Sequence, residues 1–165
     1  MQKENEFSTS NALVRGVAKA LKDKGYEFNG FTAYTDSNIF KGAGVSSSAA
    51  FEVLVVEIFN SLYLENKISP VERAIISQYA ENVYFNKPCG LLDQSGISIG
   101  SLVKLDFKTP TSPEIKKFKF FKGYSLVITN TGGDHAQLTP HYAQIRIDME
   151  EIASYFNKKV LREVD

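Results

Sequence analysis

The sequence predicts an α+β fold, and three observations support this prediction. Helical and strand-like patterns follow one another in the order helix, strand, two helices, three strands, helix, rather than in the regular alternation of a doubly wound sheet. The length of 165 residues is enough for one domain with a core of its own. No apolar run reaches the roughly 20 residues that a membrane-spanning helix needs.

The first half of the chain contains patterns for two helices and one strand. Apolar residues at helical spacing over 13–21 predict a first helix, which should end at Gly25. Residues 31–35 alternate as a strand does and lead into a glycine turn. Apolar residues over 51–62 again follow helical spacing, so a second helix should begin at serines 46–48.

The second half begins with a capping box, Ser69-Pro70-Val71-Glu72, with proline at the first helical position. It predicts a helix that continues to about Phe85. The proline of Thr139-Pro140 likewise predicts the start of a last, long amphipathic helix. Between these helices we expect three strands, over residues 99–107, 115–121 and 124–129.

Charge and cysteine content narrow the class of protein. Lysine plus arginine and aspartate plus glutamate number 19 each, so the net charge supports neither a nucleic-acid nor a membrane partner. Cys89 is the only cysteine, which excludes a disulfide within the chain and fits a reducing compartment. The polar, acidic N-terminus does not have the pattern of a signal peptide. We therefore expect a cytoplasmic protein.

The most informative segment, Gly42–Ala50, reads Gly-Ala-Gly-Val-Ser-Ser-Ser-Ala-Ala. Its glycines allow a tight turn and a close approach of a charged group to the backbone. The helix that follows presents unpaired N–H groups and the positive end of its dipole to that turn. This arrangement favours a phosphate site, although a simple serine N-cap is the alternative for any single serine. The segment is neither a Walker loop nor the dinucleotide-binding Gly-x-Gly-x-x-Gly.

Two carboxylates and one thiol are further candidates for chemistry. Glu81 lies near the end of a predicted helix, where the dipole disfavours a carboxylate, so it is either a solvated helix residue or has another role. Asp93 follows an apolar Gly-Leu-Leu and is either placed near a substrate or an N-cap for a short helix over 94–97. Cys89 has no adjacent base, which indicates a buried, inert thiol.

At these segments the chain resembles a known family. Gly42–Ala50 is similar to the phosphate-binding motif of the GHMP small-molecule kinases. Within that superfamily, four further segments resemble the galactokinases: Ala80–Tyr84, Lys87–Gln94, Thr131–His135 and Leu138–Tyr142. The resemblance implies an α+β fold similar to ribosomal protein S5 domain 2 in its N-terminal half. It also implies a partial N-terminal domain over residues 8–130 and the start of a second domain over residues 131–165.

The resemblance implies transfer of a phosphoryl group from ATP to D-galactose, giving α-D-galactose 1-phosphate and ADP, as in galactose metabolism. Ser48 and Glu81 would then bind Mg²⁺. Asp93 would accept the proton of the sugar hydroxyl, and Gly90 and Tyr142 would contact the sugar together with it. The ATP phosphates would be held by Gly42, Ala43, Gly44, Val45, Ser46, Ser47 and Ser48.

The N-terminal and C-terminal signatures of the galactokinases do not occur in these 165 residues. We therefore expect the central part of a longer kinase, which by itself does not phosphorylate galactose and can self-associate through uncovered apolar surface. Two alternatives stay open. One is a non-catalytic relative that senses galactose and ATP, and the other is a GHMP kinase for N-acetylgalactosamine or another sugar.

Overall fold

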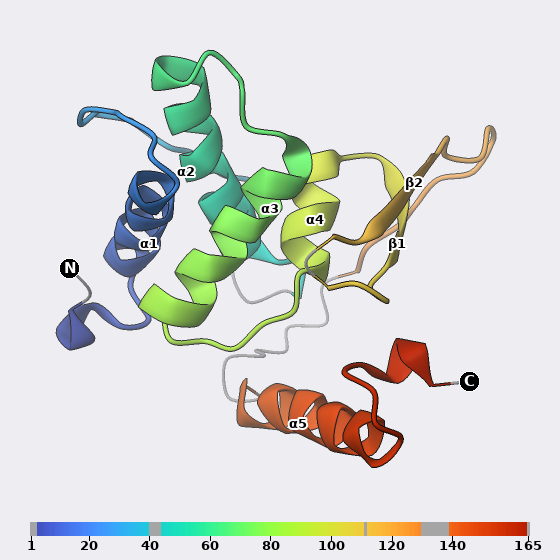
Figure 1. The fold of residues 1–165 in the computed structure, drawn as a ribbon. Coiled ribbons are helices and arrows are strands. Elements are labelled where there is room, and N and C mark those ends of the chain that lie inside the picture. Colours follow the sequence, from blue (N-terminus) through green and yellow to red (C-terminus); the bar gives the residue numbers. More distant parts are fainter. Residues whose placement is uncertain (1–2, 40–43, 111, 130–138, 165) are drawn as a thin grey trace.

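The computed structural model describes residues 3–39, 44–110, 112–129 and 139–164. The elements in chain order are η1 (Glu4–Glu6), α1 (Ser10–Asp23), α2 (Ser47–Tyr63), α3 (Pro70–Tyr79), η2 (Ala80–Tyr84), α4 (Leu92–Ile99), β1 (Leu102–Asp106), β2 (Glu114–Phe118), α5 (Thr139–Tyr155) and η4 (Leu161–Glu163). The helices α1 to α4 form the main body, and α4 lies between α3 and the two strands (Figure 1). Helices together with a small sheet confirm the predicted α+β class.

Helix α1 matches its sequence prediction. The Thr9 side chain accepts a hydrogen bond from the Ala12 N–H at the N-terminus. After Asp23 the chain leaves the helix through Gly25, whose φ of 83° is in the left-handed region that favours glycine. One face of α1, which includes Val17 and Leu21, is buried against α2 and α3.

Helix α2 contributes Val55, Val56 and Phe59 to the hydrophobic core. The rings of Phe28 and Phe31 lie with their centroids 4.5 and 5.1 Å from that of Phe59. The Tyr63 hydroxyl donates a hydrogen bond to the Gly30 carbonyl at 2.8 Å. The segment before the glycine turn is thus anchored to α2 by side chains.

The strand predicted over residues 31–35 is wrong, since this segment has no regular secondary structure. A strand needs a neighbour that completes its backbone hydrogen bonds. In the described part of the chain the only sheet is the pair β1–β2, and residues 31–35 lie beside helices instead. Alternation of side chains alone could not reveal that the described residues provide no partner strand for this segment.

Helix α3 begins at the predicted capping box, where the Ser69 hydroxyl accepts a hydrogen bond from the Glu72 N–H at 3.2 Å. The predicted helix continues to Tyr84, but its last turn is the π-helical η2. Such turns are rare and occur often at functional sites. They widen the helix by one residue and so change the direction of the side chains that follow.

The strands β1 and β2 pair antiparallel, with Leu102 opposite Phe118 and Asp106 opposite Glu114. The first predicted strand starts too early, because α4 continues to Ile99 and two residues of positive φ follow it. The third predicted strand, over residues 124–129, is wrong. These residues are irregular, and Val127 is 81% exposed.

The last predicted helix is present as α5, which packs against η4. Its Ala153 is fully buried, whereas Ile145, Met149 and Ile152 on the predicted apolar face are about half exposed. Arg162 of η4 forms an ion pair of 3.0 Å with Asp106 at the end of β1. Within the described residues, no helix has the length and apolar character of a membrane span.

Candidate functional site

The predicted phosphate loop enters α2 through two residues of positive φ, Gly44 at 72° and Ser46 at 61°. Ser46 occupies the N-cap position, but its side chain makes no capping hydrogen bond. The simple serine-cap alternative therefore fails for Ser46. The backbone turns sharply at Gly44 and Ser46, directly before the first residues of α2. Gly42 and Ala43 of the predicted loop lie outside the described residues.

Glu81 lies in the π-helical turn η2, and its side chain is directed into the protein. The residue is only 2% exposed, so the alternative of a solvated helix residue is wrong. The Ser48 hydroxyl donates a hydrogen bond to Glu81 Oε1 at 2.9 Å. The two residues to which the family resemblance assigns metal binding are thus in direct contact, although 33 positions separate them.

Gln94 and Glu52 complete this buried cluster, and the sequence interpretation did not identify either of them. The Gln94 amide donates one hydrogen bond to Glu81 Oε2 at 2.7 Å and a weaker one to Glu52 Oε2 at 3.3 Å. Both residues are fully buried. A signal for Glu52 was available, because it is a charged residue within the predominantly apolar stretch of α2.

The ionisation of Glu52 is strongly perturbed by this environment. Burial raises the pKa of its carboxyl group to about 8, and the negative charge of Glu81 adds to the rise. Glu52 Oε1 and Gln94 Oε1 are buried without a hydrogen-bond partner among the described residues. Glu52 is therefore mainly protonated at neutral pH.

Lys87 provides the positive charge of the cluster, since its Nζ atom lies 2.9 Å from Glu81 Oε1. The chain reaches this position through Asn86, whose φ is 63°, and the Lys87 N–H donates to the Glu81 carbonyl at 3.1 Å. Burial by itself lowers the pKa of the Lys87 ammonium. The hydrogen bond and the charge of Glu81 outweigh burial and raise that pKa.

Cys89 is half-buried beside the same cluster. The backbone around it is held by Asn82, whose Oδ1 accepts from the Cys89 N–H at 2.7 Å. Burial and then the charge of Glu81 raise the pKa of the thiol far above its usual value. The thiol therefore stays protonated at neutral pH, in agreement with the predicted inert cysteine.

Asp93 lies in the first turn of α4 and is exposed. The N-cap position of α4 is Leu91, so the alternative that Asp93 caps this helix is wrong. Asp93 directly precedes Gln94 in the sequence, so the first turn of α4 carries both an exposed carboxylate and the buried residue that donates to Glu81. Gly90 is exposed as well, and the side chain of Tyr142 lies outside the described residues.

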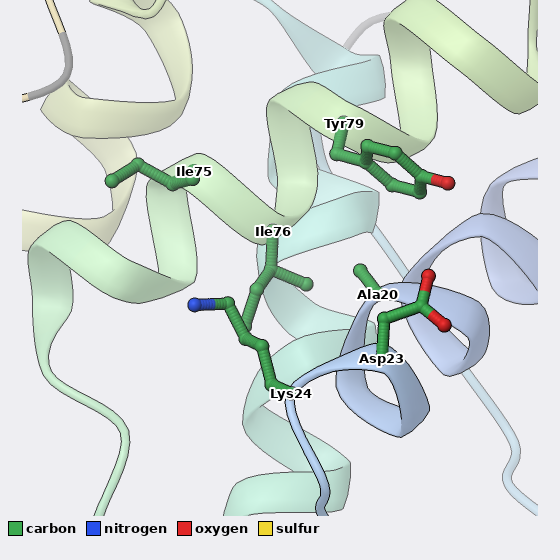
Figure 2. A pocket seen from close by; sticks show the side chains of 6 residues that line it. All are labelled: Ala20, Asp23, Lys24, Ile75, Ile76 and Tyr79. Carbon is green, nitrogen blue, oxygen red and sulfur yellow. The ribbon is translucent and has the colours of Figure 1, made fainter.

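Two hollows in the surface of the described residues do not include the residues of this cluster. The smaller hollow has a volume of about 210 Å³ and lies between the end of α1 and α3. Figure 2 shows the residues that line it: Ala20, Asp23, Lys24, Ile75, Ile76 and Tyr79. The only carboxylate among these lining residues, that of Asp23, forms an ion pair with Lys19 on the surface of α1. A larger groove between α1, α2 and residues 28–35 is mainly apolar. Neither hollow includes Ser48, Glu81 or Asp93.

Comparison with known proteins identifies the family. Residues 12–101, which contain Ser48, Glu81 and Asp93, match the model of the GHMP kinases N-terminal domain. The chain belongs to the GHMP kinase family. It is thus related to ATP-dependent phosphotransferases, and the contact between Ser48 and Glu81 lies inside the family's N-terminal domain.

Three galactokinases are similar to this GHMP kinase chain. It is 32% identical to the galactokinase of Pyrococcus furiosus over 151 residues, which cover 92% of the chain and 43% of that protein. The galactokinase of Clostridium tetani is 30% identical over 88% of the chain and 37% of its own length. The galactokinase of Thermococcus kodakarensis is 30% identical over 88% of the chain and 41% of its own length. The chain therefore spans less than half the length of these relatives.

Proposed function

We propose that the loop over residues 42–48, together with Glu81, provides the phosphate- and metal-binding side of the active site of a galactokinase-like sugar kinase. The reaction is ATP + D-galactose giving α-D-galactose 1-phosphate + ADP. The observation that carries this proposal is the 2.9 Å contact between Ser48 Oγ and Glu81 Oε1. It joins the start of a helix behind a glycine turn to a buried carboxylate. Phosphoryl transfer needs such positioning and charge neutralisation more than covalent help from the protein.

The donor atoms of Ser48 and Glu81 fit Mg²⁺. Both are hard oxygens, and the ammonium of Lys87 on Glu81 Oε1 marks a place where a positive charge is stable. No group of three or more His, Cys, Asp or Glu side chains suitable for a metal is found among the described residues. A magnesium ion held by two protein ligands would complete its shell with phosphate oxygens and water, and would neutralise the phosphates.

The remaining roles in the proposal are those that the resemblance to the galactokinases implies. The backbone N–H groups of the loop over 42–48 would hold the ATP phosphates. Asp93, exposed at the start of α4, would accept the proton of the attacking sugar hydroxyl. Gly90 and Tyr142 would contact galactose. We assign residues 8–130 to a partial N-terminal domain and residues 131–165 to the start of the second domain.

The cellular context is part of the proposal. The lone Cys89 is free, which fits a reducing cytoplasm. The partners are ATP and a monosaccharide, with no nucleic acid or membrane. Uncovered apolar side chains such as those of Leu126 and Val127 support self-association of the 165 residues on their own, and we propose that these residues alone are inactive.

An ADP-release assay on the full-length protein tests the function. We expect galactose-dependent ADP release with Mg-ATP, reduced by roughly 10²-fold or more in S48A and in E81Q, because each change removes charge stabilisation at the phosphates. The matched control is S61A, which alters an exposed serine at the other end of α2 and should leave the rate unchanged.

Two results would redirect the proposal. Faster turnover with N-acetylgalactosamine than with galactose would make the protein a GHMP kinase for that sugar. Binding of galactose and ATP without any ADP release would make it a non-catalytic sensor, and the role given to Asp93 would be wrong.

A further inference from the structure

The two oxygens of the Glu81 carboxylate face different surroundings. Oε2 accepts a hydrogen bond from the Gln94 amide at 2.7 Å, on the side of the buried Glu52. Oε1 accepts from the Ser48 hydroxyl at 2.9 Å and from the Lys87 ammonium at 2.9 Å. The carboxylate is thus fixed through one oxygen, while the other is shared by a predicted metal ligand and a cation.

Lys87 supplies the counter-charge of the Glu81 carboxylate in this structure. The Glu81 side chain is 3% exposed, and a buried carboxylate without a counter-charge is strongly unfavourable. Gln94 and Ser48 donate hydrogen bonds but carry no charge. Among the described residues, Lys87 is the one cation in contact with this carboxylate.

The Lys87 side chain can leave without unfolding its surroundings. It is 40% exposed, whereas Glu81 is buried. The backbone of Lys87 is held separately, by the hydrogen bond from its N–H to the Glu81 carbonyl. A lysine side chain has four flexible methylene groups and a strongly hydrated ammonium, so it can move into water while the turn stays in place.

We propose that Lys87 is a resident counter-ion of Glu81, and that a divalent cation displaces it from Oε1 when it binds between Ser48 and Glu81. The proposal rests on the assignment of Glu81 to the metal under the proposed function. Glu81 is neutralised at every stage, by Lys87 without metal and by the metal afterwards. Metal binding must therefore break the ion pair, and Lys87 lowers the affinity of the site for metal.

Titration of the full-length protein with Mn²⁺, followed by electron paramagnetic resonance, tests this exchange directly. K87M removes the charge but keeps the length of the side chain, and it should bind Mn²⁺ about tenfold more tightly, or better, than the wild type. K87R retains a cation that pairs more firmly with a carboxylate, so it should bind Mn²⁺ no more tightly than the wild type. K67M removes an exposed lysine paired with Glu65 and should leave the affinity unchanged.

Repeating the Mn²⁺ titration at high salt distinguishes direct displacement of Lys87 from long-range repulsion between Lys87 and the metal. If Lys87 acted only as a distant positive charge, high salt would screen the gain in K87M. Salt screens a direct, partly buried contact much less, so the higher Mn²⁺ affinity of K87M should remain in high salt. Disappearance of the gain in high salt, or Mn²⁺ binding in K87M no tighter than in the wild type, would overturn the proposal.

Thermal stability provides a second readout that needs no enzymatic activity. Metal-free K87M should have a lower Tm than the wild type, because Glu81 is left without a counter-ion, and saturating Mn²⁺ should restore it. Adding E81Q to K87M should remove both the loss and the restoration. If Mn²⁺ raised the Tm of K87M and of K87M/E81Q by the same amount, the exchange would be contradicted.

The two proposals fail separately. A protein that releases no ADP with any sugar, but whose Mn²⁺ affinity rises in K87M, would disprove the kinase function and keep the exchange. An active sugar kinase whose Mn²⁺ affinity is insensitive to K87M would keep the function and disprove the exchange.

Discussion

Gly16 of α1 and Ala80 at the start of η2 pack so closely that a Cβ atom on Gly16 would lie 2.7 Å from Ala80 Cα. The same atom would lie 2.8 Å from Ala80 Cβ. Since Ala80 directly precedes Glu81, this contact fixes the π-helical turn that carries the candidate metal ligand. The site thus depends on a glycine that is distant from it in the sequence.

We expect G16A to destabilise the protein by about 1–3 kcal/mol, the usual cost of overpacking a core. Alanine favours a helix over glycine by about 1 kcal/mol, but here the obstacle is the Ala80 backbone, which cannot rotate away. Urea unfolding measures the change. The matched control is G96A in α4, where a Cβ would meet nothing within 4 Å and stability should rise slightly. Equal stability of the two variants would refute the tight contact.

Glu52 should make the stability of the protein depend on pH. Its pKa rises from 4.5 in the unfolded chain to about 8 in the fold, so the folded state holds a proton that the unfolded state has lost. Glu52 therefore stabilises the fold below pH 4.5, and this contribution decreases as the pH rises to about 8, with a slope of at most about 1.4 kcal/mol per pH unit.

Comparison of the wild type with E52Q isolates this contribution. The neutral glutamine cannot lose a proton, so the free energy of unfolding of E52Q relative to the wild type should increase between pH 5 and pH 8. E65Q changes a glutamate whose side chain is 80% exposed and should follow the wild type. Parallel stability curves for E52Q and the wild type would mean that Glu52 titrates normally.

D93N should lower kcat of the full-length protein for galactose by about 10²-fold or more, the usual effect of losing a general base. Galactose affinity should change much less, because asparagine can still form hydrogen bonds with the sugar. D36N alters an exposed aspartate in the irregular segment before the loop and should have normal kcat. Near-normal turnover in D93N would remove Asp93 from the chemistry.

Cys89 should react slowly with a thiol reagent at neutral pH, because burial and the charge of Glu81 keep the thiol protonated. E81Q removes that charge and should accelerate the reaction. The protein unfolded in denaturant gives the rate of an ordinary thiol. Reaction of the folded protein at this same rate would show that Cys89 is neither shielded nor perturbed.

Local sequence patterns predicted most of the helices correctly. Apolar spacing, the Ser69–Glu72 capping box and Gly25 specify α1, α2, α3 and their ends through interactions between residues a few positions apart. The start of α5 at Thr139 was predicted in the same way. A helix satisfies its own backbone, so its pattern can be recognised without knowledge of the rest of the chain.

Strands were predicted less well, because their hydrogen-bond partners lie elsewhere. Residues 102–106 and 114–118 form strands since each has the other as a neighbour. Residues 31–35 and 124–129 have equally suitable side chains but remain irregular. Similarly, nothing in the local sequence near Glu81 indicates a π-helical turn, which arises where η2 packs against Gly16.

The sequence by itself determined the motifs, and through them the family and the candidates Ser48, Glu81 and Asp93. Only the tertiary structure decided that Ser48 and Glu81 meet, and that Glu52, Lys87 and Gln94 complete their surroundings. Burial and electrostatics depend on residues brought together from α2, η2 and α4. The charge of a carboxylate therefore follows from packing that no single segment encodes.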